Sequence, residues 1–103
     1  MSQKPNIQDL NKSFENRIRL GFMSILMVNE SVDFNRMKEL LNVTDGNLAS
    51  HVTALEKEAY VHVKKEFVGK KTLTSYSATK IGIKAFEDHL TALENLIKLT
   101  SKI

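Results

Sequence analysis

The sequence has no cysteine among its 103 residues. Disulfides, thiolate metal sites, thiol nucleophiles and thiol redox sensing are therefore excluded. It also lacks a long hydrophobic run, because the longest, Leu20 to Val28, contains Gly21 and Ser24 and is too short to span a bilayer. The N-terminal stretch is polar and has no apolar centre of the kind that a signal peptide requires. These absences favour a cytoplasmic protein that does not enter the membrane.

Motifs that carry enzyme chemistry are missing as well. The sequence contains no phosphate-binding glycine loop, no Gly-x-Ser-x-Gly elbow and no carboxylate pair with a pocket to work in. The histidines, His51, His62 and His89, are isolated from one another. The run Glu87-Asp88-His89 cannot bring three metal ligands together from one helix face. We therefore expect no enzyme activity, no metal site and no cofactor.

Positive charge is concentrated in one part of the chain. The formal net charge is +3, and residues 57–71 account for all of it, with five lysines against two glutamates. Such a cluster suits contact with phosphate groups. The alternative is an ordinary solvated loop rich in lysine.

The apolar spacing predicts a mainly α fold with one small β-hairpin, of the α+β class, in a single domain of residues 1–103. Residues 1–12 are expected to form a flexible lead-in, and a first helix is expected from about Ser13 to Asn29. The rest is predicted to form a helix-turn-helix over 34–59, a hairpin wing over 60–77 and a long last helix over 79–101. The expected helix caps are Asp33 or Asn35, Thr44 and Thr79.

Two of the predicted helices are apolar on more than one side. The first helix has one stripe of Phe14, Ile18, Phe22 and Ile25 and a second stripe of Leu20, Met23 and Met27. The last helix repeats apolar residues at the 4-3-4 spacing of a helical pair. We therefore expect a homodimer whose interface contains Leu20, Met23, Met27, Phe86, Leu90, Leu93 and Ile97. The alternative is a monomer in which the last helix folds back and both stripes serve one core.

The outward face of the third helix is small and polar. Opposite its buried stripe lie Gly46, Ser50, Thr53 and Lys57, with Asn47 and Ala54 beside them. Small residues allow a helix to approach a DNA groove closely, and Asn, Ser and Thr bind base edges and phosphates. His51 lies on the flank, where either a phosphate contact or a packing role is open. The alternative for the whole face is a mildly polar surface exposed to solvent.

Residues Asn16 to Leu90 resemble the winged-helix DNA-binding domains related to the MarR and ArsR transcriptional regulators, in their small stand-alone form. The segments that carry the resemblance are NRIRLGFMSIL, DFNRMKELLNVTDGNLASHVTALEKEAYV, FVGKKTLTSYSAT and TKIGIKAFEDHL. The resemblance implies a winged helix-turn-helix with a long C-terminal dimerisation helix. It also implies a transcription factor that binds a pseudo-palindromic site in double-stranded DNA as a homodimer.

By the pattern of this family, the third helix enters the major groove and the wing tip reaches the flanking minor groove or backbone. From the exposed face, the basic cluster and this resemblance together, we expect the DNA-binding residues to be Thr44, Asn47, Ser50, His51, Thr53, Lys57, Lys64, Lys70, Lys71 and Thr72. Asn47 and Ser50 are the leading candidates for reading bases.

The sequence departs from the family pattern at two positions. The third helix ends in Glu58-Ala59, where Ala-Gly is usual, and Ala78 stands where leucine is common. If Ala59 takes a left-handed conformation it costs about 1 kcal/mol, and otherwise the turn is remodelled.

Two other functions are compatible with the same fold. A winged helix also serves as a protein-interaction module that does not bind specific DNA. A small-molecule effector is a further possibility, in a pocket between the first and last helices near Met23 and Met27, although nothing identifies a ligand.

Overall fold

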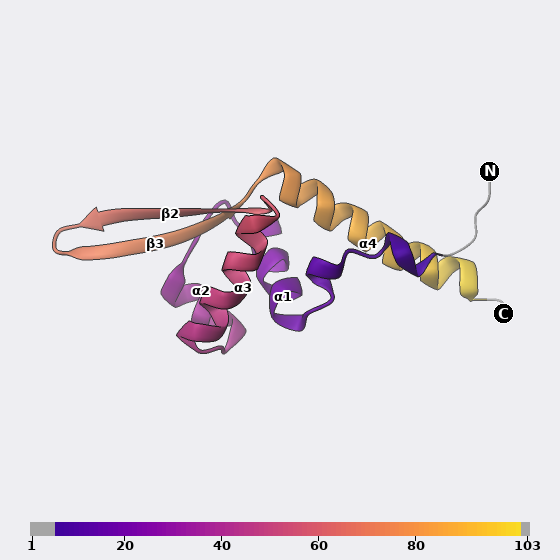
Figure 1. Ribbon diagram of the computed structural model, residues 1–103, viewed down its shortest axis with the longest axis horizontal. Helices are drawn as coiled ribbons and strands as arrows, with labels where there is room; N and C mark the ends of the chain where they lie inside the picture. The colour runs from indigo at the N-terminus through magenta and orange to yellow at the C-terminus, as the bar shows by residue number, and fades with distance from the viewer. Residues whose placement is uncertain (1–5, 102–103) are drawn as a thin grey trace.

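The structure, a computed structural model, describes residues 6–101 and places a helical body between a long hairpin and a long C-terminal helix (Figure 1). Its elements are η1 (Ile7–Asp9), η2 (Lys12–Phe14), α1 (Arg17–Met27), β1 (Val32–Asp33), α2 (Phe34–Leu41), α3 (Asp45–Lys57), β2 (Val61–Val68), β3 (Lys71–Ala78) and α4 (Lys80–Thr100). The strands form an antiparallel sheet in the order β1-β3-β2. This confirms the predicted winged helix-turn-helix of the α+β class.

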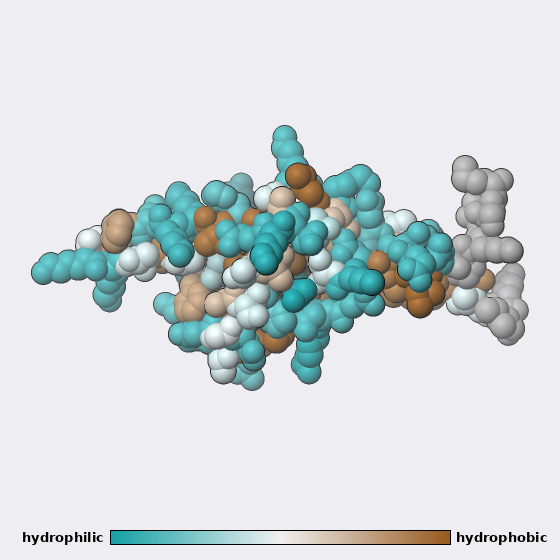
Figure 2. Space-filling model, in the orientation of Figure 1, coloured by the Kyte–Doolittle hydropathy of each residue, from teal (hydrophilic) through white to brown (hydrophobic). Residues whose placement is uncertain are grey.

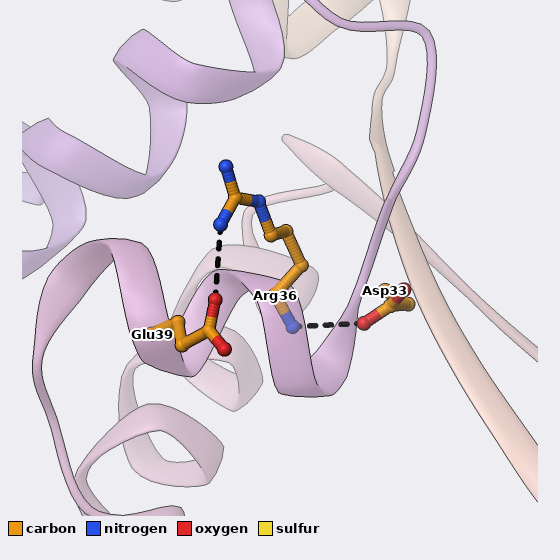
Figure 3. A network of polar contacts seen from close by, with 3 residues as sticks. All are labelled: Asp33, Arg36 and Glu39. Atoms are coloured by element: carbon orange, nitrogen blue, oxygen red, sulfur yellow. Dashed lines mark hydrogen bonds and ion pairs between the residues drawn. The ribbon is translucent and has the colours of Figure 1, made fainter.

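The helix-turn-helix begins at a carboxylate cap. The side chain of Asp33 accepts a hydrogen bond from the backbone N–H of Arg36 at 2.8 Å (Figure 3). The Arg36 side chain in turn donates to Glu39 at 2.9 Å, one turn further along α2. Asp33 therefore satisfies a free N–H of the first turn and fixes where α2 starts.

Threonine caps start the next two long helices, as the sequence predicted. Thr44 accepts a hydrogen bond from Asn47 N at 3.2 Å at the start of α3, and Thr79 accepts from Gly82 N at 2.9 Å at the start of α4. A threonine hydroxyl that accepts from the third residue of a helix is the usual cap geometry.

The N-terminal region differs from the expected lead-in and long first helix. Residues 7–14 instead contain the two short 3-10 turns η1 and η2, whose caps are Asn6 and Asn11. The α-helix begins only at Arg17, because the Asn16 side chain accepts from the backbone N–H groups of the next turn. The first five residues of the predicted lead-in lie outside the described part of the chain.

An aromatic cluster attaches these N-terminal turns to α4. The Phe14 ring lies 5.4 Å from Tyr60, 5.1 Å from Phe86 and 5.5 Å from His89, measured between ring centroids. Asn11 links the same elements, because its backbone N–H donates to His89 Nδ1 at 2.9 Å and its side chain donates to the Tyr60 hydroxyl at 3.0 Å. Residues 11–14 are therefore part of the packed domain.

The core draws residues from each of the α-helices, from η2 and from the sheet. Its members are Phe14, Phe22, Met23, Leu26, Val32, Met37, Leu48, Val52, Leu55, Val61, Tyr76 and Phe86. Met23 lies on the buried side of α1, and Phe86 packs on Phe14. The expectation that these two residues belong to a dimer interface is therefore corrected, because the protomer's own core already covers both.

The junction between α3 and β2 is tight and holds the start of α4. Ala59 has a left-handed backbone with φ of 62°, and the N–H groups of Ala59 and Tyr60 bond to Glu56 O and Leu55 O. This is the paired bonding of a Schellman helix end. The Thr79 hydroxyl donates to Ala59 O at 2.6 Å. The expected strain at Ala59 is present, and the turn is not remodelled.

Gly82 lets the first turn of α4 lie directly against this junction. A Cβ atom at Gly82 would stand 2.0 Å from the Tyr60 carbonyl oxygen, so only glycine fits there without a shift of the backbone. The wing and α4 leave the helical body in opposite directions, which gives the chain its extents of 59 × 25 × 22 Å (Figure 1).

Candidate nucleic-acid interface

The exposed face of α3 carries the residues expected to approach DNA. Gly46, Asn47, Ser50, Thr53 and Lys57 are all exposed, whereas Leu48, Val52 and Leu55 point into the core. The Thr53 hydroxyl donates to the carbonyl of Ala49 at 2.9 Å, so its oxygen remains free to accept. The exposed face of α3 therefore consists of small side chains and groups that can form hydrogen bonds, as a helix that enters a major groove requires.

The start of α3 is a polar depression shared with α1. Arg17, Asn42, Thr44 and Asn47 line it together with apolar residues of α1 and α2. Asp45, in the first turn of α3, is held by Lys38 of α2 at 2.5 Å. This ion pair offsets the negative charge of the Asp45 carboxylate, which would otherwise repel a phosphate at this end of the helix.

The two faces of the wing differ, and the pairing register shows which lysines lie on which face. Val61 and Val63 pack inward opposite Ala78 and Tyr76. Because side chains alternate along a strand, Lys65 shares the inward face and Lys64 points to the other side. Lys64 also faces Glu66 at 3.8 Å. Lys64, one of the expected DNA-binding residues, therefore lies on the face of the wing that points away from α3, and Lys65 is the wing lysine beside α3.

A groove runs between α3 and the inner face of the wing. Thr53 and Glu56 of α3 line one wall, and Lys65, Thr74 and Tyr76 line the other. Burial, and secondly the charge of Glu56, raise the pKa of Tyr76 above its ordinary value. The inner end of the groove is therefore unfavourable for an anion, while its outer end offers Lys65.

The wing tip combines exposed lysines with an exposed aromatic side chain. Gly69 and Lys70 form the two-residue turn, and Gly69 has φ of 66°. A glycine with positive φ at the first turn position matches the twist of the flanking strands. Lys70, Lys71 and Thr72 are exposed, and so is the Phe67 side chain at 84%. Phe67 lies opposite Thr72 on the same face as Lys65.

His51 proves to be a packing residue that joins α3 to α1. Its Nδ1 accepts a hydrogen bond from Arg19 Nε at 3.0 Å. Burial, and secondly the positive charge of Arg19, lower the pKa of His51 below its ordinary value of 6.5. The lowered pKa favours the neutral ring, whose Nδ1 can accept this hydrogen bond. Sequence reasoning missed Arg19, because only the apolar stripes of the first helix were considered.

The expected effector pocket is only partly present. Met23 is fully buried, but Met27 lines an open depression with Leu26, Ala78 and Ile83, where the end of α1 meets the start of α4. Asn29 and Glu30 also line this open depression, and its lining indicates no class of ligand.

The fold and the exposed face of α3 define a winged helix-turn-helix of the DNA-binding class. Residues 18–97 match the family model of the winged helix DNA-binding domain, and the chain belongs to this family. Its fold and family are those of transcriptional regulators, not of enzymes.

Relatives and solved structures agree with this assignment. An uncharacterized protein of Methanocaldococcus jannaschii is 33% identical over 87 residues, which cover 84% of this chain and 95% of the relative. A transcriptional regulator homologue from Pyrococcus horikoshii superposes with a TM-score of 0.77 at 28% identity, covering 84% of this chain and 85% of its own. NadR, solved in complex with 4-hydroxyphenylacetate, shares the fold at 18% identity and a TM-score of 0.69, over 92% of this chain and 67% of its own.

None of the helices within residues 6–101 is long and apolar enough to cross a membrane. In the same range, no group of three histidine, aspartate or glutamate side chains gathers closely enough to hold a metal ion.

Proposed function

We propose that this chain regulates transcription by binding a pseudo-palindromic operator in double-stranded DNA as a homodimer. In this proposal α3 lies in the major groove and the wing reaches the flanking backbone or minor groove. The observation that carries it is the exposed face of α3, where Gly46, Asn47, Ser50 and Thr53 stand beside a wing with exposed lysines. The core of a protein-contact face is enriched in aromatic residues, methionine and arginine, and this face of α3 carries none of them.

The DNA part is tested by titrating the full chain against duplex DNA over a series of salt concentrations. Binding should weaken steeply as salt rises, because each neutralised phosphate contributes a slope of about −0.9 in log K against log salt. Replacing both Lys70 and Lys71 by alanine should weaken binding to all sequences alike. Binding that does not respond to salt would support the alternative, a winged-helix protein-interaction module without specific DNA binding.

Base reading is tested at Asn47 and Ser50. Selection of bound DNA from a random pool should give an inverted repeat whose half-site centres are about 10 base pairs apart, as two recognition helices about 34–36 Å apart require. Asn47→Ala should change the preferred base at one position of each half-site, because a bidentate contact discriminates by about 1–3 kcal/mol. An unchanged preference would remove Asn47 from the base-reading set.

The homodimer is supported by the apolar surface that α4 leaves uncovered. Leu90, Leu93 and Ile97 are 44%, 43% and 66% exposed, and they follow the 3-4 spacing of a helical seam. Figure 2 has hydrophobic atoms gathered where the outer half of α4 lies, while the wing is mostly hydrophilic. A second copy of the chain offers an identical stripe, so a two-fold pairing covers both at once. Leu20, 37% exposed on α1, and Met27 are the remaining candidates from the first helix.

The dimer is tested by sedimentation of the full chain and of two variants. The wild type should sediment with twice the mass of the 11.7 kDa chain. Leu93→Glu should give monomers, because it places a charge in the seam. Thr91→Glu is the matched control, since Thr91 is exposed about 160° away around the same helix. A wild-type monomer, or equal behaviour of the two variants, would refute this seam.

A further inference from the structure

The helix α3 has a basic neighbour on each flank, and so far only the wing flank has been given a role in the proposed DNA binding. The wing places Lys65 beside Thr53 on one side of α3. On the other side, α1 places Arg19 against His51 and Arg17 beside Asn47. His51 lies about 100° around the helix from Ser50, between the exposed and buried faces. The two α1 arginines therefore border the same exposed face as the wing lysine.

This arrangement fits the dimensions of DNA. The major groove is about 12 Å wide and a helix with its side chains is about 10–12 Å across, so the phosphates that border the groove come against both flanks of the helix. If α3 lies in the groove, one strand passes the wing flank and the other passes the α1 flank. We propose that Arg19, held by His51, and Arg17 form a phosphate-binding subsite on α1 for the strand opposite the wing.

The Arg19 side chain is held in place while its terminal groups stay available. Nε donates to His51 Nδ1 at 3.0 Å, and in residues 6–101 the Nη groups donate to no other side chain or carbonyl. Arg19 is half-buried rather than enclosed. A guanidinium with one edge fixed and the other edge free can bind phosphate with little further loss of side-chain freedom.

His51 is in this account a positioning residue that does not itself touch DNA. Its neighbours one turn away on α3, Asn47, Leu48, Ala54 and Leu55, carry no charge, and Arg19 is the charged group that acts on it from α1. The neutral ring accepts from Arg19, whereas a protonated ring has no free acceptor and repels the guanidinium. The subsite should therefore weaken in acid.

The proposal rests on the proposed DNA binding, and its test separates the two. Duplex binding by the full chain is measured by fluorescence anisotropy over a salt series for the wild type, Arg19→Ala and Arg19→Lys. Arg19→Ala should bind about tenfold more weakly at low salt, and its slope of log K against log salt should be smaller in magnitude by about 0.9. Arg19→Lys keeps the positive charge and should keep the wild-type slope. Lys84→Ala, which removes one exposed positive charge from α4, is the control and should leave both unchanged. No binding by the wild type would refute the proposed function. A salt-dependent wild type with an unchanged Arg19→Ala slope would overturn the subsite alone.

The role of His51 is tested by a double-mutant cycle and by pH. His51→Leu should weaken binding in the wild-type background and have no effect in the Arg19→Ala background, whereas His51→Asn keeps an acceptor near the Nδ1 position. Between pH 7.5 and 5.5 the wild type should lose affinity relative to His51→Asn. A direct phosphate contact by His51 predicts additive effects and a relative gain of affinity in acid, and either result would overturn the positioning role. Circular dichroism and thermal melting of each variant keep loss of fold apart from loss of binding.

Discussion

Replacing Ala59 by glycine should stabilise the protein, although alanine is generally the better residue near a helix. Ala59 has φ of 62°, a left-handed conformation that costs an L-residue about 1–2 kcal/mol. Glycine removes this strain but adds conformational freedom to the unfolded chain, which costs about 0.4–1 kcal/mol. The Ala59 side chain is exposed, so no packing is lost. The net gain should be about 0.5–1 kcal/mol.

The assay is equilibrium unfolding in urea, supported by thermal melting. For a domain of this size the gain should raise the melting temperature by a few degrees. Ala49→Gly is the matched control, because Ala49 is exposed in the regular part of the same helix. There the same substitution should cost about 1 kcal/mol. The two changes should therefore have opposite signs.

A loss of stability in Ala59→Gly would refute the reasoning. It would mean that Ala59 does not adopt the left-handed conformation in solution, or that the conformation carries no strain there. Asn42, at the end of α2, gives a second comparison, since it has φ of 53° and asparagine tolerates this region. Asn42→Gly should gain less than Ala59→Gly.

Three further outcomes follow from the packing. Gly82→Ala should lower the free energy of unfolding in urea by about 1–3 kcal/mol, because the added Cβ meets the Tyr60 carbonyl. Gly46→Ala should not destabilise the protein, because no atom lies within 4 Å of a Cβ added there. Phe14→Ala should lower the free energy of unfolding by about 3–5 kcal/mol, an effect that a loose N-terminal segment would not produce. The pKa of His51 is lowered in the folded state, so the unfolded state binds the proton more tightly. The free energy of unfolding should therefore fall as the pH drops below 6.5 and should level off below the folded pKa. His51→Asn should lack this pH-dependent loss of stability.

The order of the elements was predictable because it depends on local signals. Thr44 and Thr79 precede apolar periods and cap helices, and Gly69 turns the hairpin, as the sequence indicated. The predicted start of the first helix was wrong, because the Phe14 side chain fits the apolar period of a helix although its backbone forms a 3-10 turn. Asn16 was the available signal, since it is a strong capping residue directly before the true start.

The interface was less predictable because it depends on tertiary neighbours. The alternation that buries Val61 and Val63 already places Lys65 on the inner face and Lys64 on the outer one, so this part was open to sequence reasoning. The contact of Arg19 with His51 was not, because the two residues are 32 positions apart and no local pattern joins them. Met23 was assigned to a partner because a helical period does not tell which neighbour covers an apolar residue.

The close fit of Gly82 against Tyr60 has a mechanical consequence for the proposed dimer. The end of α3 and the start of α4 share one rigid joint, in which Thr79 bonds to Ala59 and no side chain separates the two backbones. The outer part of α4 and the tip of the wing extend from this joint in opposite directions (Figure 1). If α4 pairs with a second copy as proposed, a change in the crossing angle of the two α4 helices would also move the two wing tips relative to each other.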